Sequence, residues 1–363
     1  MAKNLSPSMF IGLSRSDKNI ISFGSGEPDL PPPKRVFKVM PRFKYFKYGL
    51  IQGERHLRET LAKEYPKSTP ENFVITNGAS EALDLTLRAI SKIENKRKNR
   101  VLLPRPYYYT YPYLVKSAGM KPIYTDLVEG RINFDDFKKK IKDCKAVIIN
   151  SPSNPTGRVE SMKTLKKIEK LINELKVYVL SDEVYKDLIY IRENYLIKGP
   201  HVVTINSFSK TYAMCGLRIG YLWSLDQNLV NKIIEMKTCS SMNTNILAQE
   251  MAYEATKVPK SFIGKQLKIW QERRDFLYEG LLKMSFSLWK PEGAFYVFPK
   301  VKNSENFVWN LFKKYKVITY PGEWFGAKDR VRFSYALDIK KIKDGLERIE
   351  KYLKKEGRDY LIF

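Results

Sequence analysis

A lysine among hydroxyl residues is the first candidate for chemistry in this chain of 363 residues. Lys210 follows Ser207 and Ser209, and Arg218 lies eight positions later in a stretch that is otherwise mainly apolar. One standard way in which lysine enters catalysis is a Schiff base with a carbonyl group. Residues 207–210 also match the Ser-x-x-Lys pattern of serine acyl-enzymes, but the Ser-Asp-Asn and Lys-Thr-Gly elements that support that chemistry are absent. We therefore favour a Schiff-base lysine.

A Schiff base with a phosphorylated aldehyde needs a site for the phosphate, and one predicted strand-to-helix turn offers it. Gly78, Ala79 and Ser80 join the apolar run 73–76 to a predicted helix. Backbone N–H groups and the positive end of the helix dipole suit an anion at such a turn. The same residues fit a tight turn at Asn77 and Gly78 with Ser80 as the helix N-cap. Both interpretations stand on these residues alone.

Two polar residues lie where predicted strands end. Asp182 is near the end of the apolar run 177–183, and Asn154 lies in the proline- and glycine-containing segment 151–157. Because open parallel sheets bind ligands at the carboxyl ends of their strands, Asp182 is a candidate partner for a ring nitrogen. The Asn154 amide is a candidate donor to a phenolate. As alternatives, Asp182 caps a following helix, and segment 151–157 is only a turn.

Several familiar sites are excluded by what the chain lacks. Gly24 and Gly26 form a Gly-x-Gly, but the third glycine and the helix of a dinucleotide-binding fingerprint are missing. Of the two histidines, we interpret His56 as a surface residue and His201 as the start of a strand. A histidine-rich metal site cannot be built from two residues, and three widely spaced cysteines predict neither a disulfide framework nor a zinc site. We expect no metal.

The net charge of +26 brings nucleic acid into consideration. The basic residues, however, alternate with acids and with the apolar positions of predicted helices. In the last predicted helix, the apolar stripe consists of Ile339, Ile342, Leu346, Ile349 and Leu353, and lysines take the other face. We therefore expect solvated helix faces, no specific nucleic-acid partner, and only non-specific anion binding at low salt.

The chain shows no sign of a membrane or secretory segment. Residues 1–10 lack the apolar core of a signal peptide. No run approaches the roughly 20 apolar residues that a membrane helix needs. We expect a cytoplasmic protein.

Short apolar strands alternate with amphipathic helices over most of the chain. The predicted strands are residues 73–76, 101–104, 146–150, 177–183, 202–208 and 218–223. Such alternation is typical of a mainly parallel sheet covered by helices. After Trp223 helices dominate, including a long one at 260–284, and strands mixed with helices close the chain. We predict an α/β fold with an N-terminal arm (1–40) that belongs to a small α+β domain, a large cofactor-binding domain (41–275) and the small C-terminal domain (276–363).

Eight motifs give the chain a family resemblance. They are GEPD, YGLIQG, TNGASEAL, RPYYYTY, NSPSNPTG, SDEVY, SFSK followed after seven residues by arginine, and VRFSYA. In this order, from about residue 22 to 337, they resemble the aminotransferases of the aspartate aminotransferase type (class I/II). These are pyridoxal 5′-phosphate enzymes of fold type I. The resemblance implies a mainly parallel, seven-stranded sheet in the large domain and a homodimer with shared active sites.

The resemblance also implies roles around the cofactor ring. Lys210 would hold pyridoxal phosphate as a Schiff base and later move the proton between the substrate Cα and the cofactor C4′. Asp182 would keep the pyridine nitrogen charged, so that the ring can act as an electron sink. Asn154 and Tyr185 would hydrogen-bond the phenolic oxygen, and Tyr108 would stack on the ring.

Phosphate and substrate contacts are implied in the same way. The phosphate would be held by Gly78, Ala79, Ser80, Ser207, Ser209 and Arg218, together with Tyr48 from the neighbouring subunit. Arg332 would clamp the substrate α-carboxylate, and the Gly26 backbone would approach the substrate. Tyr108 and Asn154 would contact the substrate as well.

The reaction that the resemblance implies is transfer of an amino group from an L-amino acid to a 2-oxo acid, such as 2-oxoglutarate, in a ping-pong mechanism. Aspartate, alanine, aromatic amino acids and compounds like histidinol phosphate remain candidate donors, and the basic surface favours acidic ones. A C–S lyase or an amino-acid-phosphate decarboxylase is an alternative, because the cofactor supplies the difficult chemistry in all of them. A non-enzymatic nucleic-acid-binding protein is the third hypothesis.

Overall fold

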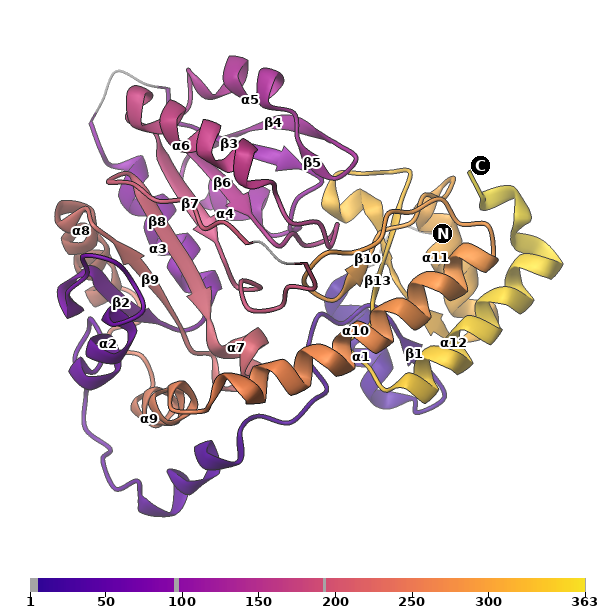
Figure 1. The fold of residues 1–363 in the computed structure, drawn as a ribbon, viewed down its shortest axis with the longest axis horizontal. Helices are drawn as coiled ribbons and strands as arrows, with labels where there is room; N and C mark the ends of the chain where they lie inside the picture. Colours follow the sequence, from indigo (N-terminus) through magenta and orange to yellow (C-terminus); the bar gives the residue numbers. More distant parts are fainter. Residues whose placement is uncertain (1–5, 95–97, 192–193, 363) are drawn as a thin grey trace.

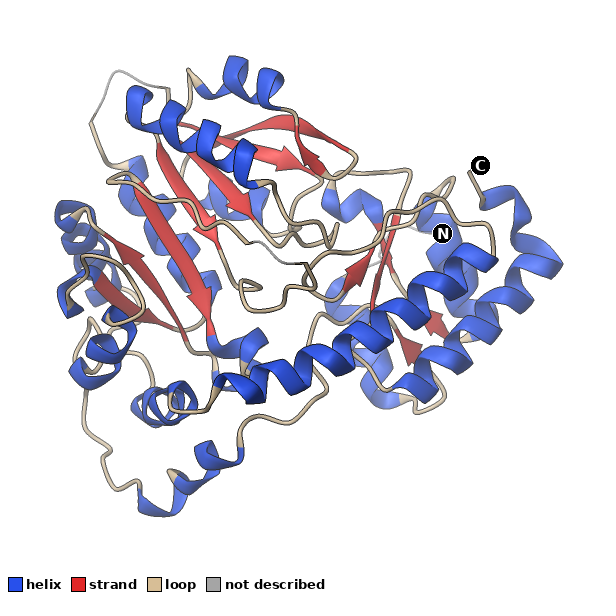
Figure 2. Ribbon diagram, viewed as in Figure 1, coloured by secondary structure: helices blue, strands red, loops and turns tan. Residues whose placement is uncertain are grey.

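The computed structural model describes residues 6–94, 98–191 and 194–362. One part of the molecule is a large sheet with helices on both faces (Figure 1). The other part contains the small strands β10 to β13 and the helices α11 (Ser304–Tyr315) and α12 (Ile339–Tyr352) (Figure 2). The long helix α10 (Lys260–Lys283) runs from one part to the other (Figure 1).

The described chain forms the large sheet from eight strands, in the order β2-β9-β8-β7-β6-β3-β4-β5. Their bounds are β2 (Phe73–Thr76), β3 (Arg100–Arg105), β4 (Lys121–Val128), β5 (Arg131–Ile132), β6 (Ala146–Asn150), β7 (Tyr178–Asp182), β8 (Val202–Ser207) and β9 (Gly220–Ser224). From β8 to β4 all neighbours pair in parallel. β9 is antiparallel to β2 and β8, and β5 is antiparallel to β4. The predicted α/β fold with a mainly parallel sheet is confirmed.

The predicted number of seven strands is one too few. The additional strand is β5, a two-residue strand that pairs with the end of β4 at the edge of the sheet. The sequence pattern also missed β4, because most of its residues are exposed or only partly buried and form no continuous apolar run. The six strands that the pattern did predict agree with the structure to within two residues at each end.

Successive strand residues face two different helical layers. Leu103, Ile148 and Leu180 pack with helices α3, α4 and α8 on one face of the sheet, whereas Leu102 and Val179 pack with α5 and α6 on the other. The α-helices around the sheet are α2 (Arg55–Ala62), α3 (Ala79–Ser91), α4 (Tyr111–Ser117), α5 (Phe134–Ile141), α6 (Met162–Leu175), α7 (Phe208–Thr211), α8 (Gln227–Thr238) and α9 (Ile246–Thr256). Because the sheet is buried on both faces, its central strands are mainly apolar, and the polar residues of β7 and β8 lie mostly toward their carboxyl ends.

The smaller part of the fold has its own core. β10 (Tyr296–Val297) and β12 (Tyr320–Pro321) flank β13 (Val331–Ser334), while β1 (Ile21–Ser22) pairs in parallel with β11 (Val317–Ile318). Helix α10 confirms the long helix predicted at 260–284, and its Leu277 and Leu281 are buried in this core. No helix within the described ranges, α10 included, combines the length and the apolar character needed to cross a membrane.

The C-terminal helix carries the predicted apolar stripe with one exception. Ile342, Leu346 and Ile349 are buried, and Leu353 is buried in the π-helical turn η6 (Leu353–Gly357) that follows α12. Ile339, by contrast, is 40% exposed. It is the first residue of α12, and the packed stripe begins one turn later at Ile342.

The N-terminal arm divides between the two parts of the fold. Phe10, in helix α1 (Pro7–Ser16), and Phe23 belong to the core of the small part. Val36, in the 3-10 turn η1 (Lys34–Lys38), packs with Leu57 beside the large sheet. Residues 23–33 between them form no helix or strand. We propose that the domain boundary in the arm lies within 23–33 and not at residue 40.

Remaining 3-10 turns connect these elements and complete the described chain. They are η2 (Met40–Arg42), η3 (Pro70–Asn72), η4 (Cys215–Leu217), η5 (Gly322–Phe325) and η7 (Arg358–Tyr360).

Phe10→Ala is expected to release helix α1. The buried Phe10 ring lies 5.7 Å from the ring of Phe312, 6.1 Å from Trp324 and 6.2 Å from Tyr320, centroid to centroid. Because removing a buried phenylalanine ring costs about 3–5 kcal/mol, the urea midpoint of unfolding should fall, and limited proteolysis should cut the chain faster between α1 and β1. Ile339→Ala is the control at an exposed position, with an expected loss below about 1 kcal/mol. Equal losses for the two variants would contradict the anchoring role of Phe10.

Candidate active site

A pocket of about 420 Å³ lies at the carboxyl ends of β6, β7 and β8, beside the N-terminus of α3 and the small part of the fold. Twelve predicted site residues line it: Gly26, Ala79, Ser80, Tyr108, Asn154, Asp182, Tyr185, Ser207, Ser209, Lys210, Arg218 and Arg332. Two do not. Gly78 lies against the side chain of Arg218, which does line the pocket. Tyr48 is exposed and lies outside the pocket. Residues predicted from distant parts of the sequence therefore meet at one sheet edge.

Lys210 is carried by α7, the short helix that follows β8. Ser207 is the N-cap of α7, because its hydroxyl accepts the backbone N–H of Ser209 at 3.1 Å. The Lys210 Nζ donates to the backbone carbonyl of Gly26 at 2.5 Å and lies 4.0 Å from the Cys215 Sγ. Among the described residues Nζ forms no ion pair within 4.0 Å. The amine is thus positioned by neutral groups at the pocket wall, which suits a nucleophilic lysine.

Asp182 is the last residue of β7 and is buried beneath the pocket. Its Oδ2 accepts the Tyr111 hydroxyl at 2.5 Å, and its Oδ1 accepts the Val184 N–H at 3.3 Å. Burial raises the pKa of Asp182 to about 6, although the Tyr111 hydroxyl, the Val184 amide and the Lys210 charge oppose that rise. The carboxylate is therefore ionised above about pH 6. Residues 183–191 form no helix, so the alternative of a helix cap at Asp182 is wrong.

The strand-to-helix turn that the sequence offers as an anion cradle is present at the start of α3. Gly78 is the N-cap with a φ of 80°, and the helix begins at Ala79. The alternative that Ser80 caps the helix is therefore wrong. A Cβ on Gly78 would lie 2.5 Å from the Arg218 Nη2, and a Cβ on Gly220 would lie 2.9 Å from the Ala79 nitrogen. Glycine is thus required on both sides of the cradle by close approach.

Arg218 lies at the rim of this cradle. The backbone of Arg218 is in the left-handed region with a φ of 52°. Its Nη1 donates to the Cys215 carbonyl at 3.0 Å. The Nη2 group donates to the Asn77 carbonyl at 3.4 Å. The side chain is exposed but lines the pocket. Its guanidinium therefore joins the segment after Lys210 to the turn before α3.

Asn154 and Tyr185 contact groups from the small part of the fold. The Asn154 Oδ1 accepts the Arg332 Nη1 at 2.8 Å, and the Tyr185 hydroxyl lies 2.8 Å from the Tyr296 hydroxyl. A Cβ on Gly26 would meet that Tyr296 hydroxyl at 2.2 Å. Gly26 therefore has no room for a side chain, and its backbone faces the pocket directly.

Arg332 is a buried cation that no carboxylate of the described residues pairs with. Its Nη2 donates to the Gly24 carbonyl at 2.5 Å, and the guanidinium carbon lies 4.4 Å from the Tyr296 ring centroid. The buried Nε has no hydrogen-bond partner, and in the described chain Arg332 forms no ion pair within 4.0 Å. A buried, unpaired guanidinium is costly unless an anion completes its hydrogen bonds. The site is therefore equipped for a carboxylate or phosphate ligand.

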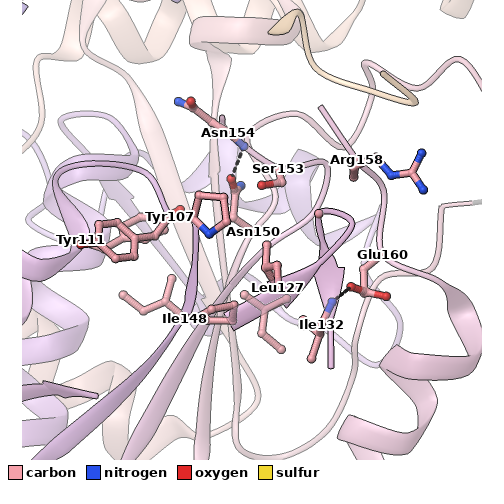
Figure 3. Close-up of a pocket in the computed structure, with 14 residues that line it drawn as sticks. Tyr107, Tyr111, Leu127, Ile132, Ile148, Asn150, Ser153, Asn154, Arg158 and Glu160 are labelled. Carbon is pink, nitrogen blue, oxygen red and sulfur yellow. Dashed lines mark hydrogen bonds between the residues drawn. The ribbon is translucent and has the colours of Figure 1, made fainter. Parts of the chain in front are cut away.

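A second, much smaller cavity of about 30 Å³ lies next to this pocket (Figure 3). It shares Tyr111, Asn150 and Asn154 with the larger one. The Asn150 Oδ1 accepts the Asn154 N–H at 2.8 Å (Figure 3). The Asn150 side-chain amide donates to the Asp182 carbonyl at 3.0 Å. This cavity has room for about one water molecule, so it supports the position of Asn154 and is not itself a substrate site.

Sequence reasoning missed thirteen of the 25 residues that line the pocket. Among them, Tyr111, Asn150, Cys215 and Tyr296 contact predicted site residues. Tyr111 and Asn150 lay within quoted motifs, three residues after Tyr108 and at the end of a predicted strand. Tyr108 lies before α4, which begins at Tyr111, so no helical periodicity links the two residues, and the motif itself was the available signal.

The pocket offers a suitable protein group for the aldehyde, the ring nitrogen and the phosphate of pyridoxal phosphate. Lys210 offers an amine for the aldehyde, and Asp182 offers a buried carboxylate for the ring nitrogen. Ala79 and Ser80 offer the N-terminal amides of α3 for the phosphate. Glycine at 78 and 220 lets the Arg218 side chain and the β9 backbone pack closely against the start of α3. Fold and pocket together define a pyridoxal-phosphate-dependent enzyme of fold type I.

Comparison with known proteins specifies the family. The profile of the family described as "Aminotransferase class I and II" matches residues 18–349. A "Probable aspartate/prephenate aminotransferase" of Aquifex aeolicus is 34% identical, with 92% of this chain and 91% of the relative covered. The crystal structure of an aspartate aminotransferase from Thermotoga maritima has a TM-score of 0.89 at 30% identity, covering 97% of this chain and 98% of that one. An aromatic aminotransferase structure from Pyrococcus horikoshii has a TM-score of 0.86 at 30% identity, covering 96% and 99%.

The chain belongs to the aminotransferase class I and II family. It is accordingly an enzyme, a pyridoxal-phosphate-dependent aminotransferase, as the motif order predicted. The comparisons do not favour a C–S lyase, a decarboxylase or a nucleic-acid-binding protein.

Asp182→Asn is expected to stabilise the cofactor-free protein at neutral pH. The pKa of the folded carboxyl lies near 6, above its ordinary value of 3.8, so ionisation destabilises the folded state fully above pH 6 and not at all below pH 4. One pKa unit corresponds to about 1.4 kcal/mol, which sets an upper bound of about 3 kcal/mol for the gain. Urea unfolding at pH 7 and pH 4 measures it. A variant that is no more stable than the wild type at pH 7 would refute the raised pKa.

Proposed function

We propose that this aminotransferase takes its amino group from an acidic L-amino acid, with aspartate as the preferred donor, and passes it to a 2-oxo acid such as 2-oxoglutarate. The observation that carries the proposal is the buried Arg332 guanidinium, whose Nε lacks a partner. The α-carboxylate of an amino acid or of a 2-oxo acid is the anion that completes it. Both substrates of the two half-reactions carry that group, so one arginine serves both.

The pocket residues have distinct proposed roles. When bound, pyridoxal phosphate supplies an electron sink for the electrons left at the substrate Cα. Lys210 would hold the cofactor and then take and return the Cα proton through its Nζ. Asp182 would face the ring nitrogen as a carboxylate, and Asn154 and Tyr185 would donate to the phenolic oxygen. Tyr108 would lie against the ring.

The phosphate would bind beside the N-terminus of α3. Its proposed donors are the N–H groups of Ala79 and Ser80, the Ser207 and Ser209 hydroxyls and the Arg218 guanidinium. The two hydroxyls lie 2.9 Å apart and both line the pocket. Gly78 precedes these amides with a φ of 80°, a conformation that favours glycine. A Cβ at this position would lie 2.5 Å from the Arg218 Nη2.

A second guanidinium supports an acidic donor. Arg15, in helix α1, lines the pocket and is exposed, so a side-chain carboxylate has a cation to meet in addition to Arg332. The curated relatives from Bacillus subtilis and Thermotoga maritima are named aspartate aminotransferases. The aromatic aminotransferase of Thermococcus litoralis keeps aromatic donors as the second candidate, because Tyr109, Tyr296 and Tyr320 also line the pocket.

We also propose a homodimer with shared sites in the cytoplasm. The segment from residue 37 to 50 exposes a concentration of large apolar side chains, namely Phe37, Met40, Tyr45, Phe46, Tyr48 and Leu50. Phe46 is 88% exposed, and patches of this kind mark interaction surfaces. A second copy that covers this segment would bring Tyr48 to the phosphate of the neighbouring site.

The purified protein is expected to convert aspartate and 2-oxoglutarate to glutamate, faster than alanine and 2-oxoglutarate. Lys210→Ala should lower this activity by about a thousandfold or more and should leave no cofactor attached to the chain after borohydride reduction. Glutamate formation by chromatography and cofactor retention by mass spectrometry are the measurements. Lys145→Ala, a lysine outside the pocket, is the control. Ammonia or carbon dioxide in place of glutamate, or labelling that survives Lys210→Ala, would overturn the assignment.

Tyr48→Ala is expected to weaken cofactor affinity by about tenfold, the effect of losing one hydrogen bond to a charged group. Mixing this variant with Lys210→Ala under subunit exchange should recover sites with wild-type affinity, because Lys210 of one chain then meets Tyr48 of the other. Cofactor titration by absorbance measures both effects. Tyr113→Ala, at a similarly exposed tyrosine, is the control. Failure of the mixture to recover affinity would argue against sites shared between subunits.

A further inference from the structure

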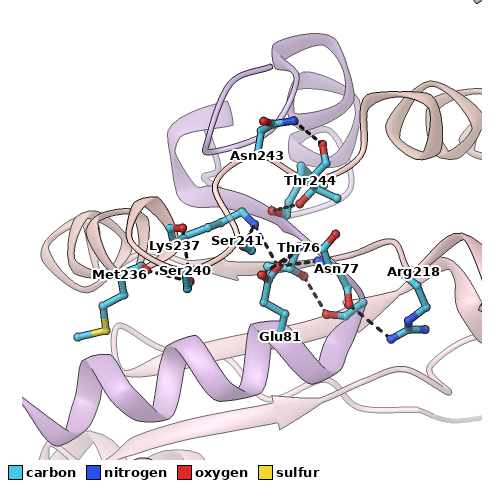
Figure 4. A network of polar contacts seen from close by, with 12 residues as sticks. Thr76, Asn77, Glu81, Arg218, Met236, Lys237, Ser240, Ser241, Asn243 and Thr244 are labelled. Carbon is cyan, nitrogen blue, oxygen red and sulfur yellow. Dashed lines mark hydrogen bonds and ion pairs between the residues drawn. The ribbon is translucent and has the colours of Figure 1, made fainter. Parts of the chain in front are cut away.

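A fully buried lysine lies beneath the start of α3, outside the pocket lining (Figure 4). Lys237 is near the end of α8, and its Nζ is 3.1 Å from the Glu81 Oε2. Nζ also donates to the Ser241 hydroxyl at 2.9 Å. A buried charge pair adds little net stability compared with apolar side chains of the same size. The pair therefore calls for a role other than stability.

Glu81 is the third residue of α3, and its carboxylate turns back over the helix start. It accepts the Asn77 backbone N–H at 2.6 Å and the Asn77 side-chain amide at 3.1 and 3.2 Å (Figure 4). This is the reach-back contact of a capping box, extended to the residue before the Gly78 N-cap. The carboxylate thereby ties the turn to the helix immediately before the amides of Ala79 and Ser80.

The turn is held on its other sides as well. The Thr76 hydroxyl donates to the Gly78 carbonyl at 3.0 Å, and Arg218 donates to the Asn77 carbonyl (Figure 4). The Thr244 hydroxyl, in the connection between α8 and α9, donates to the Ile75 carbonyl at 3.0 Å. The end of β2 and the helix start are thus one hydrogen-bonded unit, in which Glu81 holds both the backbone N–H and the side chain of Asn77.

The negative charge of Glu81 would repel an anion in the cradle, and the positive charge of Lys237 offsets that repulsion. Burial raises the pKa of Glu81, but hydrogen bonds from Ser241 and the Asn77 amide and the Lys237 charge outweigh burial and hold that pKa below its usual value. Burial lowers the pKa of Lys237, while Glu81 opposes this. The carboxylate is therefore ionised at neutral pH. Without Lys237 it would repel a phosphate bound at the same helix terminus.

We propose that Glu81 and Lys237 are positioning residues that make the pocket selective for a phosphate-bearing ligand. Glu81 fixes the cradle amides through Asn77, and Lys237 removes the electrostatic penalty of having a carboxylate there. The proposal rests on the proposed phosphate site at Ala79 and Ser80. It extends that site to residues that touch neither cofactor nor substrate.

The test compares two ligands that differ only in the phosphate group. Cofactor-free protein is titrated with pyridoxal 5′-phosphate and with pyridoxal, and the ratio of the two dissociation constants is measured by absorbance. Lys237→Met should weaken pyridoxal phosphate by about tenfold or more and pyridoxal by less than about twofold, since only the phosphate is repelled. Lys145→Met removes another buried lysine, whose Nζ contacts the Ser91 and Ile93 carbonyls, and should leave the ratio unchanged.

Two charge-neutral double variants separate positioning from charge and remain informative if Lys237→Met does not fold. Glu81→Gln with Lys237→Met keeps an acceptor for the Asn77 N–H and should restore the ratio to near the wild-type value. Glu81→Leu with Lys237→Met lacks that acceptor and should bind pyridoxal phosphate about tenfold more weakly than the glutamine variant, with pyridoxal unaffected.

The outcomes separate this inference from the function on which it rests. A wild-type protein that binds both ligands equally would overturn the phosphate site itself. A wild-type preference that survives in Lys237→Met and in both double variants would overturn the positioning role alone. Equal weakening of both ligands in the variants would do the same, because it would indicate general damage to the fold and not a selective loss of phosphate binding.

Discussion

Three ionisable side chains converge in one pocket without cancelling one another. Lys210, Asp182 and Arg332 form no ion pair in the described chain, and their contacts are backbone carbonyls, amides, a tyrosine hydroxyl and Cys215. Holding such groups apart inside a protein is costly, and it requires a rigid support. The carboxyl ends of parallel strands provide it, because the hydrogen-bonded sheet fixes where each strand stops.

The pocket also depends on contacts between the two parts of the fold. Asn154 follows β6 in the large part, whereas Arg332 lies on β13 in the small part, and the two side chains are hydrogen-bonded. Tyr185 and Tyr296 form a second such link. A ligand held between Lys210 and Arg332 therefore spans both parts. Binding of its carboxylate by Arg332 and chemistry at Lys210 thus both depend on how the two hydrophobic cores are placed relative to each other.

Local patterns predicted the elements of this structure better than the contacts among them. The apolar runs at β6 and β7 placed Asn154 just after one strand and Asp182 at the end of the other, and the turn at Gly78 placed the expected anion cradle. The Tyr111 contact with Asp182 joins residues 71 positions apart, and the Lys237 contact with Glu81 joins residues 156 apart. No periodicity in a short window encodes such pairs. β4 was missed for a related reason, because partial burial beside the sheet edge removes the apolar signal.

The burial of Asp182 has a consequence for the enzyme inside a cell. A cationic ring above the carboxylate would remove the destabilisation that ionisation causes, and any ligand that binds only the folded state shifts the folding equilibrium. Freshly synthesised chains that lack the vitamin derivative are then the ones that quality-control proteases degrade first. The supply of the cofactor would thus influence the abundance of this protein, in addition to the fraction that is active.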